Sequence, residues 1–443
     1  MLDVYGRRRS ARCDGVGRRD FLRVGSLAFG GLSLSNLLRA QAATTSNTPK
    51  PKAKSGILVW LPGGPSHFET WDPKPAAPSE IRGPYGSIPT KVPGLHISDL
   101  FPKLASIAHK FSIVRSCCHA NSGHGGGERW VMTGYNSRSP EFELPHDYPR
   151  VGSVVAKMRG QNVPGMLPFV AVPPSNLHNN SAAYLGATYN PLELYSNGRQ
   201  WEMQLDPQVK PERLAARRDL RMSLDRIARD IDGSGMMDAM DSLEAQALDV
   251  VIGGKAREAF DPSKEPEEFH ERYGKHEWGK SCLLARRLIE AGTTFVTVSV
   301  GSWDQHGSAG GSIKEKYAEY APQVDQAVST LLCDLDDRGL LDETVIYLLG
   351  EFGRTPRINN TGGRDHWPQA MSVLMTGGGL KRGQIVGATS PHGEHPIDRT
   401  LGPADILATV YHQLGIDYRA EFTNGEGRPI KLLSEGEPVR ELV

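Results

Sequence analysis

Short, continuous apolar runs recur along the chain, and glycine, proline or polar residues bound each of them. The clearest runs are residues 57–61, 111–115, 294–300, 344–349 and 372–376. Uninterrupted apolar runs of this length are typical of strands that are buried on both faces, as in a parallel sheet. We therefore expect these segments to form the strands of a buried central sheet.

Helical periodicity alternates with these runs. Apolar residues between Tyr317 and Leu335 fall on one helical face, with Gly339 as a stop signal, and a last helix is expected at about 404–414. Residues 205–291 are rich in arginine, aspartate, leucine and alanine at helical spacing, which predicts a helical insertion. Alternating strands and helices predict an α/β fold with a mostly parallel sheet.

The final helix of this insertion has a clear end. Its pattern continues through residues 281–290, and Gly292 follows as the expected stop.

The first part of the chain carries an export pattern. Arg18 and Arg19 precede a weakly apolar run at 24–38, and Ala40-Gln41-Ala42 offers a small-residue cleavage site. This arrangement is similar to a bacterial twin-arginine signal. An uncleaved anchor or a chance arginine pair is the alternative interpretation.

This pattern predicts the organisation of the whole chain. Residues 1–42 would be the signal peptide, 43–55 a polar linker, and 56–443 one α/β domain with the insertion at about 205–291. The apolar run is shorter than the ~20 residues that a membrane-spanning helix needs. We therefore expect a periplasmic or secreted protein without a stable membrane span after processing.

Composition narrows the classes of partner. The chain has 51 Lys plus Arg and 51 Asp plus Glu, so it has no global basic field and no nucleic-acid partner is expected. Its 49 glycines and 31 prolines indicate many turns on a compact scaffold. No C-x-x-C pair occurs, and a disulfide framework is not indicated.

Carboxylates and imidazoles cluster after three predicted strands. Asp304 and His306 follow the run ending at residue 300, Glu351 follows the run ending at 349, and Asp365 and His366 lie on the next loop. Ligands of open α/β sheets bind at the carboxyl ends of strands, so these groups can converge. Carboxylate and imidazole groups together are typical ligands of divalent transition metals. A pair of such ions can stabilise the attacking and leaving oxygens of a displacement at phosphorus or sulfur. Taken singly, such residues more often cap helices, pair with arginine or face water.

Three further residues are candidates for the same centre. His124 lies in the glycine-rich segment 119–127, and His67 follows the first predicted strand; each could be a ligand or simply face solvent. Arg354 could bind an oxyanion or form an ion pair with Glu351.

Several strings along the mature chain resemble one bacterial exported family, catalogued as domain of unknown function 1501. They are GGPSHFETWDPKP at 63–75, WDQHG at 303–307, GEFGRTPRIN at 350–359 and GRDHWPQA at 363–370. The resemblance covers about residues 56 to 418. That family is placed in the alkaline phosphatase and sulfatase superfamily, which implies a doubly wound α/β core and a metal centre at the sheet edge.

The resemblance also implies roles for individual residues. Asp304 and His306 match the ligand-bearing loop after a central strand, Glu351 falls where the superfamily has an aspartate, and His366 fits a later histidine ligand. The sulfatase nucleophile position, counted back from the M-T-G string that ends at residue 134, holds His124. The aspartate that usually follows the first strand is missing.

Because the usual nucleophile and the usual aspartate are absent, we expect a hydrolase in which a metal-activated water molecule is the nucleophile. We expect Asp304, His306, Glu351, Asp365, His366 and His67 to hold one or two divalent ions (Zn, Mn, Fe or Ca). Arg354 would steady the anion, and His124 would be an extra ligand or an acid–base group. The expected substrate is a phosphate or sulfate ester, either a small molecule or a polysaccharide. The alternative is a non-catalytic, metal-containing binding protein on the same scaffold.

Overall fold

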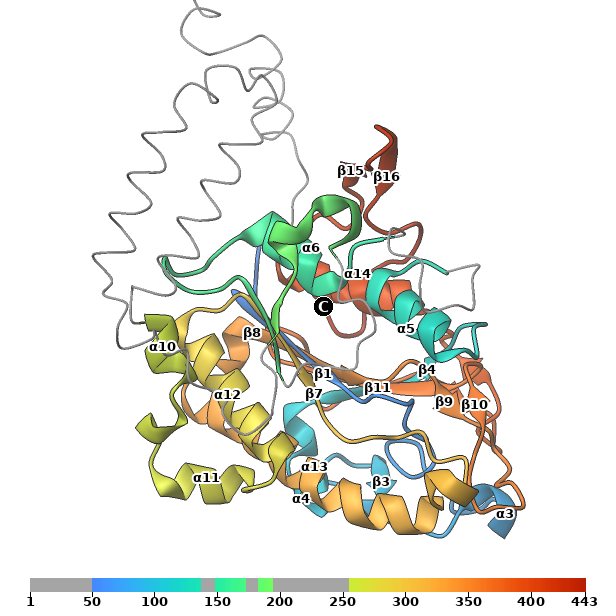
Figure 1. Ribbon diagram of the computed structural model, residues 1–443. Coiled ribbons are helices and arrows are strands. Elements are labelled where there is room, and N and C mark those ends of the chain that lie inside the picture. Colours follow the sequence, from blue (N-terminus) through green and yellow to red (C-terminus); the bar gives the residue numbers. More distant parts are fainter. Residues whose placement is uncertain (1–49, 137–147, 173–181, 194–254) are drawn as a thin grey trace, which may run out of the picture. The chain divides into compact units, whose positions relative to one another are not determined.

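The computed structural model describes most of the chain after its first fifty residues (Figure 1). The predicted signal peptide and most of the predicted linker lie outside the described residues, as do residues 205–254 of the predicted insertion. Within the described part, no helix combines the length and apolar character needed to cross a membrane. The described residues are 50–136, 148–172, 182–193 and 255–443.

The described strands build one eight-stranded sheet in the order β12-β4-β11-β8-β1-β7-β5-β6. Each apolar run expected to be a strand lies in it. Every strand pairing within this sheet is parallel except those of β11, which runs antiparallel to both β4 and β8. Its strands are β1 (Ser55–Trp60), β4 (Ser112–Cys117), β5 (Phe169–Val172), β6 (Leu192–Glu193), β7 (Phe295–Ser299), β8 (Thr344–Leu349), β11 (Met371–Thr376) and β12 (Ile385–Val386).

Helices cover both faces of the sheet (Figure 1). Side chains of a strand alternate between faces, so Ile57 and Val59 join one apolar core while Leu58 and Trp60 join the other. The mostly parallel, doubly wound α/β fold is therefore confirmed. The first core contains α4 (Pro102–Ser106), α10 (Lys255–Phe260), α12 (Glu277–Ala291) and α13 (Ile313–Asp337), and the second contains α5 (His124–Thr133), α6 (Val151–Arg159) and α14 (Pro403–Gln413).

Shorter elements surround this framework. Four strand pairs lie outside the main sheet, and two short helices, α3 (Ser79–Arg82) and α11 (Glu267–Tyr273), complete the described α-helices. The pairs are β2–β3 (Ser87–Pro89, His96–Ser98), β9–β10 (Gly353–Arg354, His366–Trp367), β13–β14 (Ala388–Thr389, Pro396–Asp398) and β15–β16 (Glu421–Thr423, Pro429–Lys431).

Helix ends follow local chemistry. Gly292 adopts φ 107° and ends α12, as its position after the periodic segment predicts. At the start of α13, Ser312 and Glu315 form a capping box, so this helix begins before the predicted apolar face at Tyr317.

The glycine-rich segment after β4 differs from the prediction. We expected a loop through Gly127, but α5 begins at His124 and takes Gly125, Gly126 and Gly127 into its first turn. Glycine is a weak helix former, yet close packing favours it here. A Cβ on Gly126 would lie 2.2 Å from the Asn121 side chain, and one on Gly127 would lie 3.1 Å from Phe352. The glycines therefore allow α5 to approach the neighbouring loops.

The direction of β11 brings a fourth segment to the same sheet edge. Parallel strands β4, β7 and β8 end at this edge. His124 begins the helix that follows β4, and Asp304 and Glu351 lie in the loops after β7 and β8. Because β11 is reversed, its first residue Met371 pairs with Cys117 at the end of β4. The segment that precedes β11, which includes His366, therefore also lies at this edge.

Candidate metal centre

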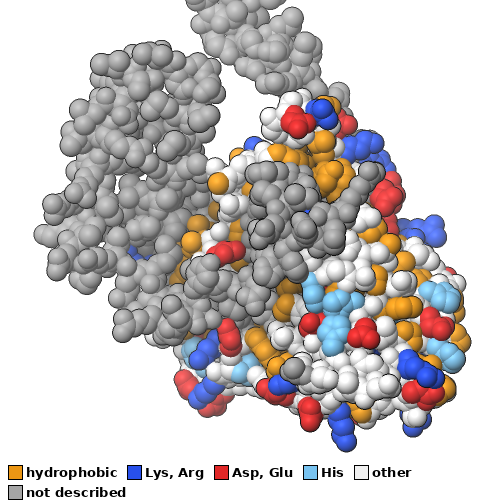
Figure 2. Space-filling model, turned by 45° about the vertical axis from the view of Figure 1, so that its right-hand side comes forward, with side chains coloured by type: hydrophobic (Ala, Val, Ile, Leu, Met, Phe, Trp, Pro, Cys, Tyr) orange, Lys and Arg blue, Asp and Glu red, His pale blue; other side chains and the backbone are white. Residues whose placement is uncertain are grey.

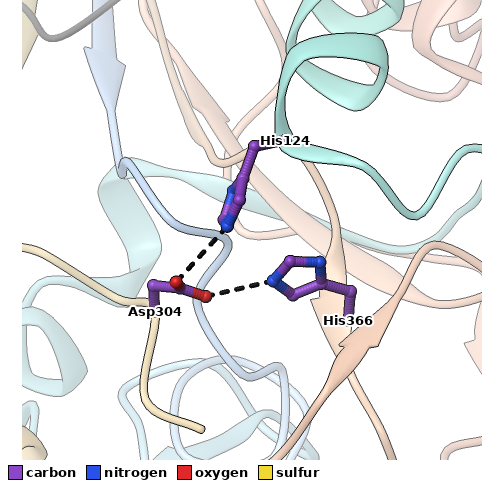
Figure 3. A group of neighbouring side chains, drawn as sticks. All are labelled: His124, Asp304 and His366. Atoms are coloured by element: carbon purple, nitrogen blue, oxygen red, sulfur yellow. Dashed lines mark hydrogen bonds and ion pairs between the residues drawn. The ribbon is translucent and has the colours of Figure 1, made fainter. Parts of the chain in front are cut away.

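His124, Asp304 and His366 converge at the carboxyl edge of the sheet (Figure 3). One ligand atom from each lies within 4.8 Å of the others. The two carboxylate oxygens of Asp304 face different rings: Oδ2 lies 3.3 Å from His124 Nε2, and Oδ1 lies 3.1 Å from His366 Nε2. The first residue of α5 and the first residue of β10 therefore meet around the carboxylate of a loop residue.

His306 belongs to the same cluster. Its Nε2 lies 2.9 Å from Asp304 Oδ1 and 2.9 Å from His366 Nε2. The extended D-x-H stretch therefore brings both of its side chains to one point, as their i, i+2 spacing predicts. Histidines gather with carboxylates on one face of the molecule (Figure 2), and the side chains of His306 and Asp304 are 38% and 39% exposed. The cluster is accessible from solvent.

The other nitrogen of each ring has its own acceptor. Nδ1 of His366 lies 2.7 Å from the Ser122 carbonyl, Nδ1 of His306 lies 2.7 Å from Asp365 Oδ1, and Nδ1 of His124 lies 2.7 Å from Glu351 Oε1. A carbonyl oxygen can only accept a hydrogen bond, so Nδ1 of His366 donates. A ring with its proton on Nδ1 alone carries a lone pair at Nε2, which a metal ion can bind; without an ion, Nε2 must also carry a proton to donate to Asp304 at 3.1 Å. This arrangement needs a cation or a proton among the rings.

The charges within the cluster shift two pKa values. Burial opposes the charged form of His124, but its hydrogen bonds to Asp304 and Glu351 outweigh burial and raise its pKa to about 9. Burial would raise the pKa of Asp304, yet hydrogen bonds from His124, His366 and Arg354 hold it well below its usual range. Without a metal ion, His124 therefore carries a proton and Asp304 is ionised at neutral pH.

Glu351 is enclosed by protein groups. The Gly63 N–H donates to Oε1 and Oε2 at 3.0 and 3.2 Å, and the residue is only 3% exposed. Its backbone carbonyl accepts from His119 Nε2 at 2.6 Å. Because His119 Nδ1 accepts from the Asn121 N–H at 3.2 Å, the proton of the neutral ring is on Nε2. Burial lowers the pKa of His119 to about 4, which keeps that ring neutral.

His119 was not among the sequence candidates. Its position supplied a signal, because it lies two residues beyond β4 and therefore at the sheet edge where the other candidates meet. It fixes the backbone of Glu351 rather than pointing at the cluster.

Arg354 connects several loops. It is 1% exposed, and its Nε and Nη1 donate to the carbonyls of Gly64 (2.8 Å) and Arg364 (2.9 Å). Nη2 donates to the Gly63 carbonyl and to Asp304 Oδ1 at 2.6 Å. The sequence left open an oxyanion contact or an ion pair with Glu351; the ion pair in the structure is with Asp304. The buried guanidinium therefore holds the Asp304 carboxylate in position.

A second buried arginine holds the loop that carries Asp365 and His366. Arg364 binds Glu69 through two hydrogen bonds, Nη2 to Oε1 at 2.7 Å and Nε to Oε2 at 3.1 Å, and both side chains are 0% exposed. It also donates to the carbonyls of Thr355 and Pro356. Sequence reasoning missed this pair, because 295 residues separate its members and neither stands out locally.

His67 lies apart from the cluster. Its Nε2 lies 2.9 Å from the Gly393 carbonyl, and its ring contacts Phe68. Burial lowers its pKa to about 4, and Nδ1 has no hydrogen-bond partner among the described residues. The structure thus groups Asp304, His306, His366 and His124, with Glu351 and Asp365 hydrogen-bonded to two of the histidines, and it leaves His67 beside Gly393.

The converging donors fit a divalent transition metal. Imidazole nitrogens and one carboxylate are the donors typical of zinc, iron and manganese sites. Each imidazole is also oriented by an acceptor on its far nitrogen, which is common among metal-binding histidines.

Fold and site together define an α/β protein with a candidate metal centre at the carboxyl edge of its sheet. The chain belongs to the family described as "Protein of unknown function (DUF1501)", whose sequence profile matches residues 53–443. No curated protein matches the chain in sequence.

Several solved structures match this chain at low sequence identity and low TM-score. The lipoteichoic acid synthase LtaP from Listeria monocytogenes is 12% identical over 86% of this chain and 75% of its own, with a TM-score of 0.38. A protein in the alkaline phosphatase superfamily from Vibrio parahaemolyticus is 12% identical over 84% and 68%, with a TM-score of 0.39. The phosphonate monoester hydrolase SpPMH from Silicibacter pomeroyi is 13% identical over 88% and 76%, with a TM-score of 0.36. At these identities and TM-scores, the activities of the three proteins do not indicate the activity of this chain.

Proposed function

We propose that this protein is a metal-dependent hydrolase of the alkaline phosphatase and sulfatase superfamily that cleaves a phosphate or sulfate ester. The observation that carries the proposal is the convergence of His124, Asp304, His306 and His366 at the carboxyl edge of the sheet. Such edges bind ligands in open α/β folds. The substrate would be a small-molecule or polysaccharide ester.

A divalent ion bound to these residues would acidify a water molecule and polarise the ester oxygen. The protein groups would orient the reaction. Asp304 faces two sides of the centre at once, and Arg354 fixes its Oδ1 from the buried side at 2.6 Å. His124, at the position of the sulfatase nucleophile, cannot become formylglycine. Water is therefore the proposed nucleophile.

Ser122 offers a direct test of this nucleophile, because its carbonyl touches His366 and the residue is exposed. A Ser122→Ala variant keeps that carbonyl and removes only the hydroxyl. We expect its kcat to stay within about threefold of the unchanged protein. A loss of 10³-fold or more, or a trapped phosphoserine, would show that the serine attacks instead.

The activity itself is tested by turnover of aryl phosphates and aryl sulfates. We expect turnover by the purified protein, its loss after chelation, and its return with added Zn²⁺, Mn²⁺ or Fe²⁺. An Asp304→Asn variant should be inactive, and His109→Ala, which removes an exposed histidine elsewhere, should retain full activity. Stoichiometric metal without turnover of any ester in the panel would contradict the hydrolase.

That outcome would favour a second candidate, a non-catalytic binding protein that contains metal. The observation in its favour is the absence of cysteine, serine or threonine at the position of the superfamily nucleophile, which His124 occupies.

We also propose export by the twin-arginine route, which the Arg18-Arg19 pair with Phe21 and Leu22 supports. Changing both arginines to lysine should keep the protein in the cytoplasm and leave the precursor uncleaved. Immunoblots of cell fractions measure this, and an unchanged distribution would argue against the route.

A further inference from the structure

We infer that the centre binds a single divalent transition-metal ion through Asp304, His124, His306 and His366, while Glu351 and Asp365 bind the histidines and not the ion. This inference rests on the proposed metal dependence of the site but not on hydrolysis. It goes beyond the sequence prediction, which counted Glu351 and Asp365 as ligands and left the number of ions and the role of His124 open.

The first argument is the orientation of the three rings. Each uses Nδ1 for an outer acceptor, namely Glu351 Oε1, Asp365 Oδ1 or the Ser122 carbonyl, at 2.7 Å in every case. Each therefore turns Nε2 toward Asp304. Metal-bound histidines typically donate their second nitrogen to a carboxylate or carbonyl in this way. Asp304 and the three Nε2 atoms are therefore the inner groups, which can bind an ion, and the groups that accept from Nδ1 are the outer groups.

The second argument is distance. Zinc lies about 2.0–2.2 Å from nitrogen and oxygen ligands, so neighbouring ligands of a tetrahedral site lie roughly 3.4 Å apart. The distances from Asp304 oxygens to the Nε2 atoms of His306, His366 and His124 are 2.9, 3.1 and 3.3 Å. The Nε2 atoms of His306 and His366 are also 2.9 Å apart, so these donor atoms are as close together as neighbouring ligands of one ion.

The third argument is the place where Glu351 and Asp365 contact the histidines. Both oxygens of Glu351 accept from the Gly63 N–H, Oε1 also contacts His124, and the residue is 3% exposed. Asp365 contacts the outer nitrogen of His306 and has a 58% exposed side chain. Both carboxylates therefore contact the Nδ1 atoms of the histidines, and the Nε2 atoms lie next to Asp304.

The donor set also restricts the ion. Calcium takes six to eight oxygen ligands, whereas three imidazoles and one carboxylate suit zinc, iron or manganese. We therefore expect Zn²⁺ to bind with a stoichiometry of one and Ca²⁺ not to compete at millimolar concentration.

Isosteric variants test which residues bind the ion. Their Zn²⁺ affinity and stoichiometry can be measured by calorimetry and metal analysis. Asp304→Asn and His366→Gln should lose stoichiometric binding. Glu351→Gln and Asp365→Asn should keep one ion and bind it about 10- to 100-fold more weakly, the usual effect of removing an outer partner. His109→Ala is the matched control for loss of a histidine and should bind like the unchanged protein.

Loss of stoichiometric binding in a folded Glu351→Gln or Asp365→Asn variant would overturn the assignment, and so would two ions per chain. X-ray absorption of the Zn²⁺-loaded unchanged protein needs no variant: imidazole scattering around a nitrogen-rich first shell is expected, and an all-oxygen shell would overturn the inference. Binding as predicted without ester turnover would leave this inference intact and contradict only the proposed hydrolase.

Discussion

Asp304 places its two carboxylate oxygens toward different histidines, so one short side chain links both halves of the cluster. Its identity could be predicted from the sequence, as could those of His306 and His366, because each lies near the end or start of an apolar run. The sequence could not predict which ring nitrogen of each histidine faces Asp304 and which one contacts another partner. Which ring nitrogen faces Asp304 depends on outer partners such as the Ser122 carbonyl, which only the folded chain brings near.

Stability of the metal-free protein should depend on the proton at His124. Its folded pKa of about 9 exceeds the ordinary value of 6.5. A raised pKa means that this proton stabilises the fold fully below pH 6.5, and that the contribution is lost as pH rises toward 9. Urea unfolding of the chelated protein should therefore show falling stability across that window, and His124→Asn should flatten the slope. An equal slope in both proteins would contradict the assignment.

Metal affinity should change with pH in the opposite direction. An ion must displace the His124 proton, so Zn²⁺ should bind more tightly as pH rises from 6.5 to 9. Calorimetry in buffers of different ionisation enthalpy measures the proton release, and pH-independent binding would contradict this expectation.

We predict that Arg354 stabilises the fold both by its charge and by the several hydrogen bonds that its planar guanidinium donates. Arg354→Met leaves Asp304 without its buried partner and frees the carbonyls of Gly63, Gly64 and Arg364. Asp304 is 39% exposed, so the cost comes mainly from the buried carbonyl oxygens left without a donor; we expect a loss of about 1–3 kcal/mol, which urea unfolding can measure. Arg354→Lys should recover only part of this, because lysine lacks the planar fork. The control Arg357→Lys, at a 76% exposed side chain, should change stability by at most ~0.5 kcal/mol.

Individual elements were predictable to different degrees. The run at 344–349 matches β8 residue for residue, because Thr344 and the five apolar residues after it lie between Glu343 and Gly350. The direction of β11 was not predictable, since a run of this length looks the same in parallel and antiparallel strands. The glycine turn of α5 was missed because its cause is contact with Asn121 and Phe352, which lie outside the helix.

The β9–β10 pair should depend on the buried contact between Arg364 and Glu69. Glu69→Gln removes the counter-charge of a fully buried guanidinium, so we expect destabilisation of about 3–5 kcal/mol. Metal affinity should fall as well, because Arg364 immediately precedes Asp365 and His366. Glu80→Gln, at a 45% exposed side chain, is the control and should have little effect on either measurement. Unchanged metal affinity in a destabilised Glu69→Gln protein would show that the loop is held by other contacts.

At the scale of the whole molecule, the alternation of strands and helices predicted the α/β class. The uninterrupted apolar run at 57–61 predicted a strand buried on both faces, and β1 is buried along its whole length. Long-range partners such as Glu69 and Arg364 could not be inferred, because no local pattern relates them. The cluster joins the loops after β4 and β7 to the segment before β11. An ion there would act as a cross-link between distant parts of one domain.

Metal binding should therefore raise the melting temperature of the domain. A ligand that binds only the folded state stabilises it by about 2.7 kcal/mol at a free concentration 100 times Kd. Thermal unfolding with Zn²⁺ and with chelator measures the difference, and Asp304→Asn should remove it. An equal gain in that variant would place the stabilising ion elsewhere.

His366 reaches the carboxyl edge of the sheet because β11 runs antiparallel to β4 and β8, so the site is complete only when β11 has paired with both. The ligands Asp304 and His366 are 62 residues apart, and the ligand His124 is 227 residues from its hydrogen-bond partner Glu351, so the site forms only after strands distant in the chain have paired. Pairings of this kind form late, because loop closure must precede them. During refolding, Zn²⁺ capture should lag behind the recovery of helical circular dichroism. The ion would then act as a reporter of the completed sheet, and not as the nucleus around which the chain first folds.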